Sequence, residues 1–285
     1  MFNDYTLQSP TTDPGELGSL FADLPTDLAG IAQVAQGLIY HYMAGPYIYG
    51  WNPPKERLAE INTRHLNRIL ASLLEKDARP LTEPRAIEQR FIGCCRDFSL
   101  LACAILRQQG QAARLRYGFA NYFAPGYWGD HVIVEVWQHD RWQRFDPQFA
   151  GQPGWDFSLL DMPPEVFATG GRAWQMCRTE GADADRFGLG PDETFVRGWW
   201  FVRSRLQLDV AALNKLELLC WDSIDGLHET VPADVAMLDE MAVLSLEPDS
   251  TALRHRCTTD PRWQLPTTVT CFHPAIGPAF PVEVA

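Results

Sequence analysis

Residues 93–98, Gly-Cys-Cys-Arg-Asp-Phe, lead into a segment with the apolar spacing of a helix buried on one face. From Cys95 onward the apolar residues recur three and four positions apart, at Phe98, Leu101, Ala102, Ile105 and Leu106. Gly93 predicts a turn before this helix, and Gly110 predicts its end. Cys95 is therefore expected in the first turn, where unpaired N–H groups and the helix dipole favour a thiolate and lower the thiol pKa.

Three segments with strand character follow this helix. Residues 113–119 alternate in polarity, residues 131–137 are rich in β-branched side chains, and residues 142–146 end before a proline. A short turn pairs the last two as a hairpin, which brings His131 within about two positions of Asp146. His131 begins its strand and Asp146 ends the next, so both are expected at one edge of the sheet.

A thiol, an imidazole and a carboxylate in this order are typical of nucleophilic attack on an acyl group. Cys95 is the expected nucleophile, His131 the expected acid and base, and Asp146 the group that orients the imidazole. Cys95 and Asp146 each have a structural alternative, because free cysteines are usually packed in the core and an aspartate before a proline often caps a turn. The three residues in the expected order favour catalysis.

Three short motifs carry a family resemblance: Gly-Cys-Cys-Arg-Asp-Phe at residues 93–98, Asp-His ending at His131, and Phe-Asp-Pro around Asp146. In this order they resemble the transglutaminase-like cysteine superfamily, with papain-like relatives, over residues 85–150. In that pattern the nucleophile directly precedes a polar residue, an acid and an aromatic residue, which selects Cys95 and not Cys94. The resemblance implies an α+β fold in which the nucleophile-bearing helix packs on an antiparallel sheet. Many relatives have Ala-Trp after the histidine, whereas this chain has Val-Ile, so no tryptophan contribution is expected there.

Further residues are candidates for binding the substrate. The backbone N–H of Cys95 is a natural oxyanion donor because it belongs to a helix start. Gln89 lies six residues before the nucleophile, a spacing that resembles papain-like proteases, with a surface or structural role as the alternative. Tyr127 and Trp128 lie in an aromatic loop that leads into His131 and are expected to line a cleft, with loop packing as the alternative. Other aromatic residues are candidates for the same cleft: Tyr47, Tyr49, Trp51 and Tyr122.

The seven cysteines are irregularly spaced, which favours reduced thiols in a cytoplasm over a disulfide framework. Cys94 and Cys103 are expected to pack in the core. No CxxC or HxxxH spacing accompanies Cys94 and Cys95, and adjacent thiols chelate one ion poorly, so neither a metal nor a cofactor is expected. The remaining histidines, His41 among them, have no motif around them and are expected to be ordinary surface or core residues.

Composition excludes several classes of protein. A net charge of −12 argues against a nucleic-acid partner. No apolar run approaches membrane-spanning length, and the acidic N-terminal segment does not resemble a signal peptide. We therefore expect a cytoplasmic protein that acts on a peptide, amide or amine substrate, in an oligomeric state that the sequence does not indicate.

The chain is expected to divide into four regions. These are a mobile tail over 1–23, a helical region over 24–79, the transglutaminase-like core over 80–150, and a mixed C-terminal extension over 151–285 that shapes the pocket. Helices are expected over residues 27–42, 54–76, 210–219 and 231–246, with the last forty residues largely irregular.

Two functions remain open from the sequence. In the first, the protein is a thiol-dependent amidase, peptidase or acyltransferase that forms a thioester at Cys95. Water and amines compete for such a thioester, so pocket shape and water exclusion decide between hydrolysis and transfer. In the second, the protein is a catalytically inactive transglutaminase-like fold that serves as a binding or scaffold protein. The complete set of Cys95, His131 and Asp146 favours the enzyme.

Overall fold

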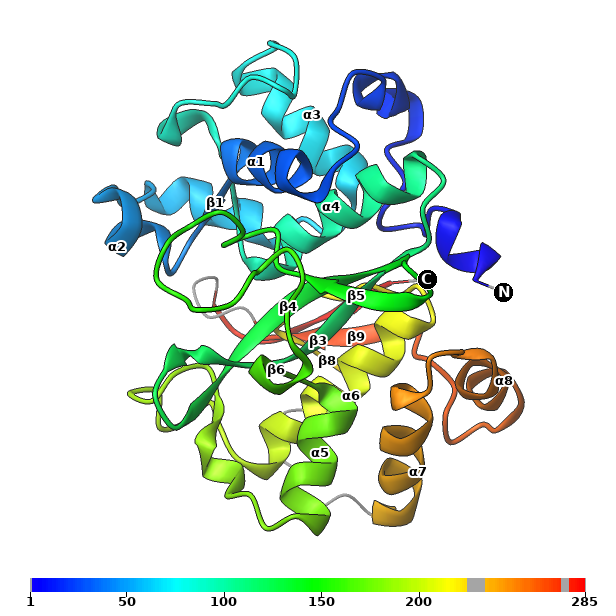
Figure 1. The fold of residues 1–285 in the computed structure, drawn as a ribbon. Coiled ribbons are helices and arrows are strands. Elements are labelled where there is room, and N and C mark those ends of the chain that lie inside the picture. Colours follow the sequence, from blue (N-terminus) through cyan, green and yellow to red (C-terminus); the bar gives the residue numbers. More distant parts are fainter. Residues whose placement is uncertain (1, 225–233, 273–276, 285) are drawn as a thin grey trace.

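The computed structural model describes residues 2–224, 234–272 and 277–284, which form an α+β fold with a central antiparallel sheet between two groups of helices (Figure 1). The α-helices are α1 Leu28–Leu38, α2 Gly45–Tyr49, α3 Leu66–Lys76, α4 Cys95–Gln108, α5 Gly170–Thr179, α6 Trp199–Leu213, α7 Val235–Leu246 and α8 Thr251–Thr259. The strands are β1 Ile39–His41, β2 Phe91–Gly93, β3 Ala113–Ala124, β4 Tyr127–Gln138, β5 Arg141–Phe145, β6 Phe167–Thr169, β7 Phe187–Gly188, β8 Asp222–Ser223, β9 Thr268–Cys271 and β10 Phe280–Glu283.

The central sheet has the strand order β5-β4-β3-β6, and β7 pairs in parallel with β4. His131 is paired with Gly118 on β3, and Val134 is paired with Phe145 on β5. Continued by one residue, this register sets Asp146 opposite the position two residues after His131, so both side chains project from the same face. Gly118 is required here, because a Cβ atom would lie 2.1 Å from the Ala168 carbonyl oxygen on β6.

Helix α4 packs on one face of the sheet, with α1 and α3 outside it (Figure 1). Its start is fixed by Asp97, whose carboxylate accepts a hydrogen bond of 2.8 Å from the backbone N–H of Cys94. Its end is followed by Gly110 at φ +77°, a conformation that glycine adopts without strain. The helix beginning at Cys95 is thus formed where local signals in the sequence predict it.

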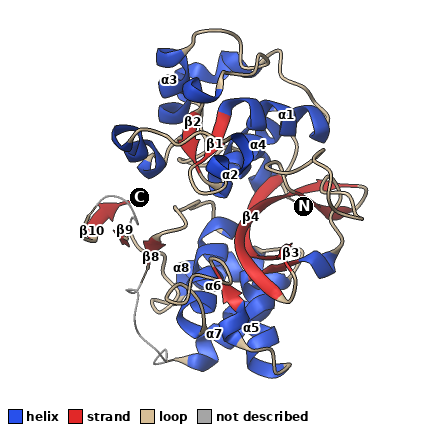
Figure 2. Ribbon diagram, turned by 90° about the vertical axis from the view of Figure 1, so that its left-hand side faces the viewer, coloured by secondary structure: helices blue, strands red, loops and turns tan. Residues whose placement is uncertain are grey.

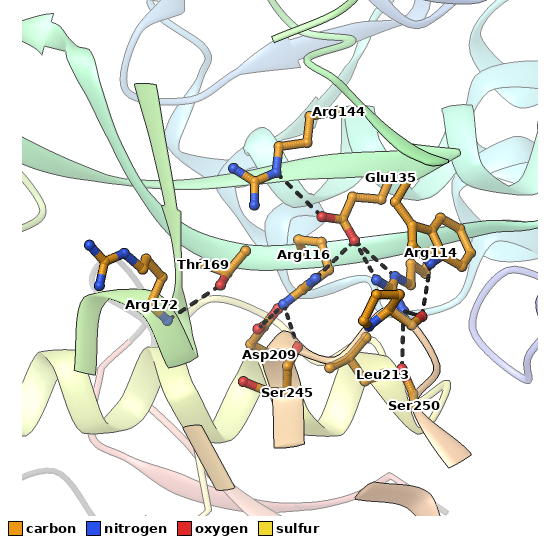
Figure 3. Close-up of polar contacts among 12 residues, drawn as sticks. Arg114, Arg116, Glu135, Arg144, Thr169, Arg172, Asp209, Leu213, Ser245 and Ser250 are labelled. Carbon is orange, nitrogen blue, oxygen red and sulfur yellow. Dashed lines mark hydrogen bonds and ion pairs between the residues drawn. The ribbon is translucent and has the colours of Figure 1, made fainter. Parts of the chain in front are cut away.

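The C-terminal helices cover the other face, where buried ion pairs attach them to β3 and β4 (Figure 3). Arg116 on β3 donates to Asp209 on α6 through Nε and Nη2, both at 2.9 Å, and to Glu135 on β4 at 2.8 Å. Glu135 also pairs with Arg114 and Arg144. These charges satisfy one another away from water, so the extension is joined to the sheet by paired groups rather than by apolar contact alone.

The N-terminal segment differs from the mobile tail expected over residues 1–23. Phe2 packs against Trp137 and Trp142, and the Tyr5 hydroxyl donates to the Leu213 carbonyl at 2.6 Å. Hydroxyl groups of Ser9 and Thr11 donate to Glu217, which is fully buried. A composition rich in serine and threonine indicates a solvated tail, but here these hydroxyls hydrogen-bond a buried carboxylate.

Other expected elements shift where long-range pairing competes with the helix pattern. The helix expected over 27–42 ends at Leu38, because the next three residues form β1 and pair in parallel with β2. The pattern over 54–76 forms a 3-10 helix, Lys55–Asn62, and then the separate helix α3. The expected helix over 210–219 is α6, which begins and ends earlier.

The last part of the chain contains more regular structure than expected. Helix α8 is followed by β9 and β10, which join β8 in a small sheet of order β10-β9-β8 that lies apart from the central sheet (Figure 2). Helix α7 matches the helix expected over 231–246 from Val235 onward, and residues 231–233 lie outside the described residues. Across the described ranges, none of the helices combines the length and the apolar character that a bilayer span requires.

Candidate active site

A cavity of about 620 Å³ lies where the start of α4 meets the sheet and α6. Cys95, His131, Arg205 and Cys220 line it, together with His41 from β1. Most of the remaining wall is apolar or aromatic and includes Tyr42, Tyr47, Phe123, Phe149, Trp200, Phe201 and Trp221. A cavity of this size with a few polar groups has the character of a small-molecule or peptide side-chain site.

Cys95 is the first residue of α4, and only 6% of its surface is exposed. One turn later, Ser99 donates a hydrogen bond of 2.8 Å to the backbone carbonyl of Val132. This bond ties the first turns of α4 to β4 next to His131. Cys95 and His131 therefore reach the same cavity from two elements that are directly joined.

His131 and Asp146 form a buried hydrogen-bonded pair. The His131 ring donates through Nε2 to Asp146 Oδ2 at 2.9 Å, and Asp146 is fully buried. The same carboxylate accepts from the Tyr122 hydroxyl at 2.7 Å and from the backbone N–H groups of Gln148 and Phe149 at 2.9 and 3.3 Å. Four donors hold the carboxylate in one orientation, and its bond to Nε2 leaves Nδ1 of the neutral imidazole as a proton acceptor.

Aromatic rings enclose the imidazole of His131. The ring centroids of Phe123 and Tyr122 lie 5.0 and 6.2 Å away, both edge-on, and that of Phe149 lies 6.0 Å away. His131 is 2% exposed as a result. Low water access strengthens the electrostatic coupling between this imidazole and its neighbours.

The sulfur atoms of Cys94, Cys95 and Cys220 lie within 4.8 Å of one another. Hydrogen bonds from Cys94 and Cys95 lower the pKa of Cys220 well below its usual value. The hydrogen bond to Cys220 raises the pKa of Cys95, and burial adds to this effect. The sequence predicts a lowered pKa at Cys95 from the helix start alone; in the structure the pKa is instead lowered at Cys220, which the sequence analysis did not identify.

His41 also lines the cavity, beside the start of α4. Strand β1 pairs His41 with Gly93, two residues before Cys95. The ring accepts the backbone N–H groups of Met43 and Ala44 on Nδ1, both at 3.2 Å, so the neutral ring carries its proton on Nε2. Burial, together with the charge of His131, lowers the pKa of His41 to about 4. Its imidazole is therefore a neutral hydrogen-bond donor near pH 7, although no local motif marks it in the sequence.

Two other polar features belong to the cavity wall. Asp130 and Arg205 form a buried ion pair, with Arg205 Nη2 2.8 Å from Asp130 Oδ2. Gln148 is 5% exposed, and its Oε1 atom has no hydrogen-bond partner among the described residues. An acceptor without a partner in a buried wall is available to an N–H group of a bound molecule.

Three residues expected at the site lie elsewhere. The Gln89 side chain donates to the Lys76 carbonyl at 3.5 Å and is not part of the cavity wall. Tyr127 and Trp128 line a separate cavity of about 400 Å³ with Phe187. The expected loop before His131 is part of strand β4, and four extended residues place Tyr127 about 13 Å from His131 along the strand. Of the other aromatic candidates, Tyr47 lines the cavity.

Comparisons with known proteins give a family match and a solved structure with partial similarity. The model of the transglutaminase-like superfamily matches residues 43–147, a range that contains Cys95, His131 and Asp146. Among solved structures, a protein from Cytophaga hutchinsonii that bears the name "Putative Cysteine Protease" aligns with 15% sequence identity and a TM-score of 0.35. The alignment covers 59% of this chain and 45% of the other, so this chain spans less than half of that protein. None of the curated proteins matches the sequence.

Proposed function

Residues 43–147 of this chain belong to the transglutaminase-like superfamily, and on this premise we propose that the protein is an enzyme that forms a thioester at Cys95. The acyl donor is an amide or peptide bond, and the acceptor is water or an amine. The observation that supports this most directly is the buried His131–Asp146 pair in a cavity that Cys95 also lines. This arrangement supplies a nucleophile, a base and a group that orients the base.

In the first half of the reaction, His131 Nδ1 takes the proton of the Cys95 thiol as the sulfur attacks the carbonyl carbon of the substrate. The Asp146 carboxylate stabilises the imidazolium that forms. When the tetrahedral intermediate collapses, the carbon–nitrogen bond breaks and the imidazolium returns the proton to the leaving amine. Cys95 then carries the acyl group as a thioester.

In the second half, water or an amine attacks the thioester. His131 takes a proton from the incoming nucleophile and returns it to the sulfur of Cys95, which restores the resting enzyme. Hydrolysis and transfer differ only in this second nucleophile. The aromatic wall around His131 lowers the access of bulk water, so the occupant of the cavity decides which reaction dominates.

Two donors are available for the negative oxygen of the tetrahedral intermediate. The backbone N–H of Cys95 lies at the start of α4, where the helix itself does not use it. His41 supplies a second, neutral N–H group from β1, which is paired with the strand that leads into α4. In this proposal His41 takes the role that the sequence assigns to Gln89.

The other residues that line the cavity indicate which substrates it could bind. The aromatic and apolar side chains suit an apolar group next to the scissile bond. The free Oε1 atom of Gln148 suits an N–H donor, which every peptide substrate carries. These features favour a peptide or an amide with an apolar substituent as the acyl donor.

The experiment that tests this function is trapping of the thioester. The purified protein is incubated with amide and activated-ester acyl donors, quenched in acid and measured by intact-mass and peptide mass spectrometry. We expect one acyl group on the peptide that contains Cys95, lost in Cys95→Ala and retained in the neighbouring variant Cys94→Ala. Adding amines to the acylated enzyme then separates transfer from hydrolysis by the product formed.

Two results would contradict the proposal. Acylation retained in Cys95→Ala but lost in Cys220→Ala would assign the nucleophile to Cys220. A folded protein that binds the acyl donors without any covalent adduct would indicate a binding protein with a transglutaminase-like fold.

A further inference from the structure

Three thiols lie close together at the N-terminal end of α4, and the proposed mechanism uses only one of them, that of Cys95. Cys94 precedes the first residue of α4, Cys95 is that residue, and Cys220 comes from the segment before β8. All three sulfur atoms lie within 4.8 Å of one another and line the same cavity. Cys94 and Cys95 are buried, and Cys220 is half-buried.

The spacing of these sulfurs matches the requirements of a thiophilic ion. Zinc–thiolate bonds of about 2.3 Å place sulfur atoms about 3.8 Å apart in a tetrahedral site. Pairs already within 4.8 Å need to approach by about 1 Å at most, which side-chain rotation supplies. Adjacent cysteines alone make a poor chelate, but a third sulfur from a distant segment completes a three-thiolate face.

The donor atoms also decide which kind of cation suits this cluster, because all three are sulfur atoms. Soft thiolate ligands select d10 ions such as zinc(II) or copper(I) over hard ions such as magnesium.

We propose that Cys94, Cys95 and Cys220 form a three-thiolate site for a thiophilic d10 cation, with the fourth coordination position open to the cavity. Binding converts the bound thiols to thiolates and releases their protons to the solvent, so affinity rises with pH. The part of this inference that concerns activity rests on the proposed function. An ion that holds the Cys95 sulfur withdraws the nucleophile, and the occupied protein is the inactive form.

Zinc(II) and cobalt(II) are the probes. The protein is reduced with a phosphine, freed of metal by a chelator and titrated, with metal content measured after gel filtration. We expect one equivalent of zinc. Cobalt(II) should give thiolate charge-transfer absorption in the near ultraviolet and the visible bands of a tetrahedral site. Neither readout depends on turnover, so failure of the proposed function leaves this test intact.

Variants identify the ligands. Cys220→Ser should weaken zinc binding by more than the 10–100-fold that loss of an outer-sphere partner costs. Cys177→Ser is the matched control, because Cys177 is a buried thiol on α5 outside the cluster. It should bind zinc as the parent does.

Alkylation provides a measurement that needs no variant to fold. Zinc should protect the peptides containing Cys95 and Cys220 from iodoacetamide and leave labelling at Cys177 unchanged. Zinc binding at less than one tenth of an equivalent with all three thiols reduced would overturn the proposal. So would full zinc binding in Cys220→Ser, because the cation would then sit elsewhere.

Discussion

Replacing Asp209 by alanine removes one of the two carboxylates that hold Arg116 between the central sheet and α6 (Figure 3). Asp209 is fully buried and also accepts the backbone N–H of Tyr117 at 3.0 Å. Without it, Arg116 keeps the Ser245 carbonyl, to which it donates at 3.0 Å, and a single carboxylate, that of Glu135, which already pairs with two other arginines. The variant therefore leaves a buried positive charge and a buried N–H group with incomplete partners.

Removing one partner of a buried ion pair typically costs about 3–5 kcal/mol. In a domain of this size each kcal/mol corresponds to roughly 2–4 °C, so we expect Asp209→Ala to lower Tm by about 6–20 °C. Urea unfolding followed by tryptophan fluorescence and circular dichroism measures the loss of free energy of unfolding directly.

The control for this prediction is Glu180→Gln. Arg172 and Glu180 form an ion pair whose side chains are 41% and 47% exposed, so its loss should cost less than about 1 kcal/mol. Equal losses in Asp209→Ala and Glu180→Gln would refute the reasoning, because burial would then have no effect on the cost of a missing partner.

The remaining predictions concern the site. Asp146→Asn should lower kcat strongly but leave measurable thioester formation. Tyr122→Phe removes one of the four donors to the same carboxylate, so it should lower kcat by less. Acylation rates measured by quenched flow would show whether the two variants fall in this order. Cys220→Ala should speed alkylation of Cys95 by iodoacetamide at neutral pH, because the hydrogen bond that raises the pKa of Cys95 is gone; an unchanged rate would show that this bond does not control the thiol. His41→Phe should lower kcat by about 10²–10³ with little change in KM if its N–H stabilises the oxyanion, and an effect confined to KM would contradict that role. The pKa of His41 is about 4 in the folded protein and about 6.5 in the unfolded chain, so the unfolded chain takes up the proton first as the pH is lowered. The contribution of His41 to the free energy of unfolding is therefore complete above about pH 6.5 and falls toward pH 4. Unfolding measured as a function of pH should lack this dependence in His41→Phe.

Structural features that depend on residues close together in the chain could be predicted from the sequence. The start and end of α4 follow from Asp97 and Gly110, which act within one turn of the helix. The approach of His131 to Asp146 follows from a hairpin in which the two residues are fifteen positions apart and the register leaves little freedom. The family resemblance added the chemical roles, which remain predictions.

Structural features that depend on contacts between distant segments of the chain could not be predicted from the sequence. Cys220 reaches Cys95 only because the C-terminal extension folds back over the cavity, and its local sequence carries no sign of this. The extension of β4 back to Tyr127 separates Tyr127 and Trp128 from His131 along the strand, whereas the aromatic and glycine content of that segment indicated a loop. In the same way, pairing of β1 with β2 ends α1 at Leu38 despite a continuing helical pattern.

The residues that line the cavity are far apart in the sequence, and this has a consequence during translation. The 125 residues that separate Cys95 from Cys220 take about 6–25 s to synthesise at 5–20 residues per second. In the first part of that interval α4 and strands β3, β4 and β5 are translated, whereas α6 and the segment before β8, which close the cavity, are translated last. A nascent chain therefore contains Cys95 before the cavity is complete, and we expect the proposed activity to be absent until translation has passed Cys220.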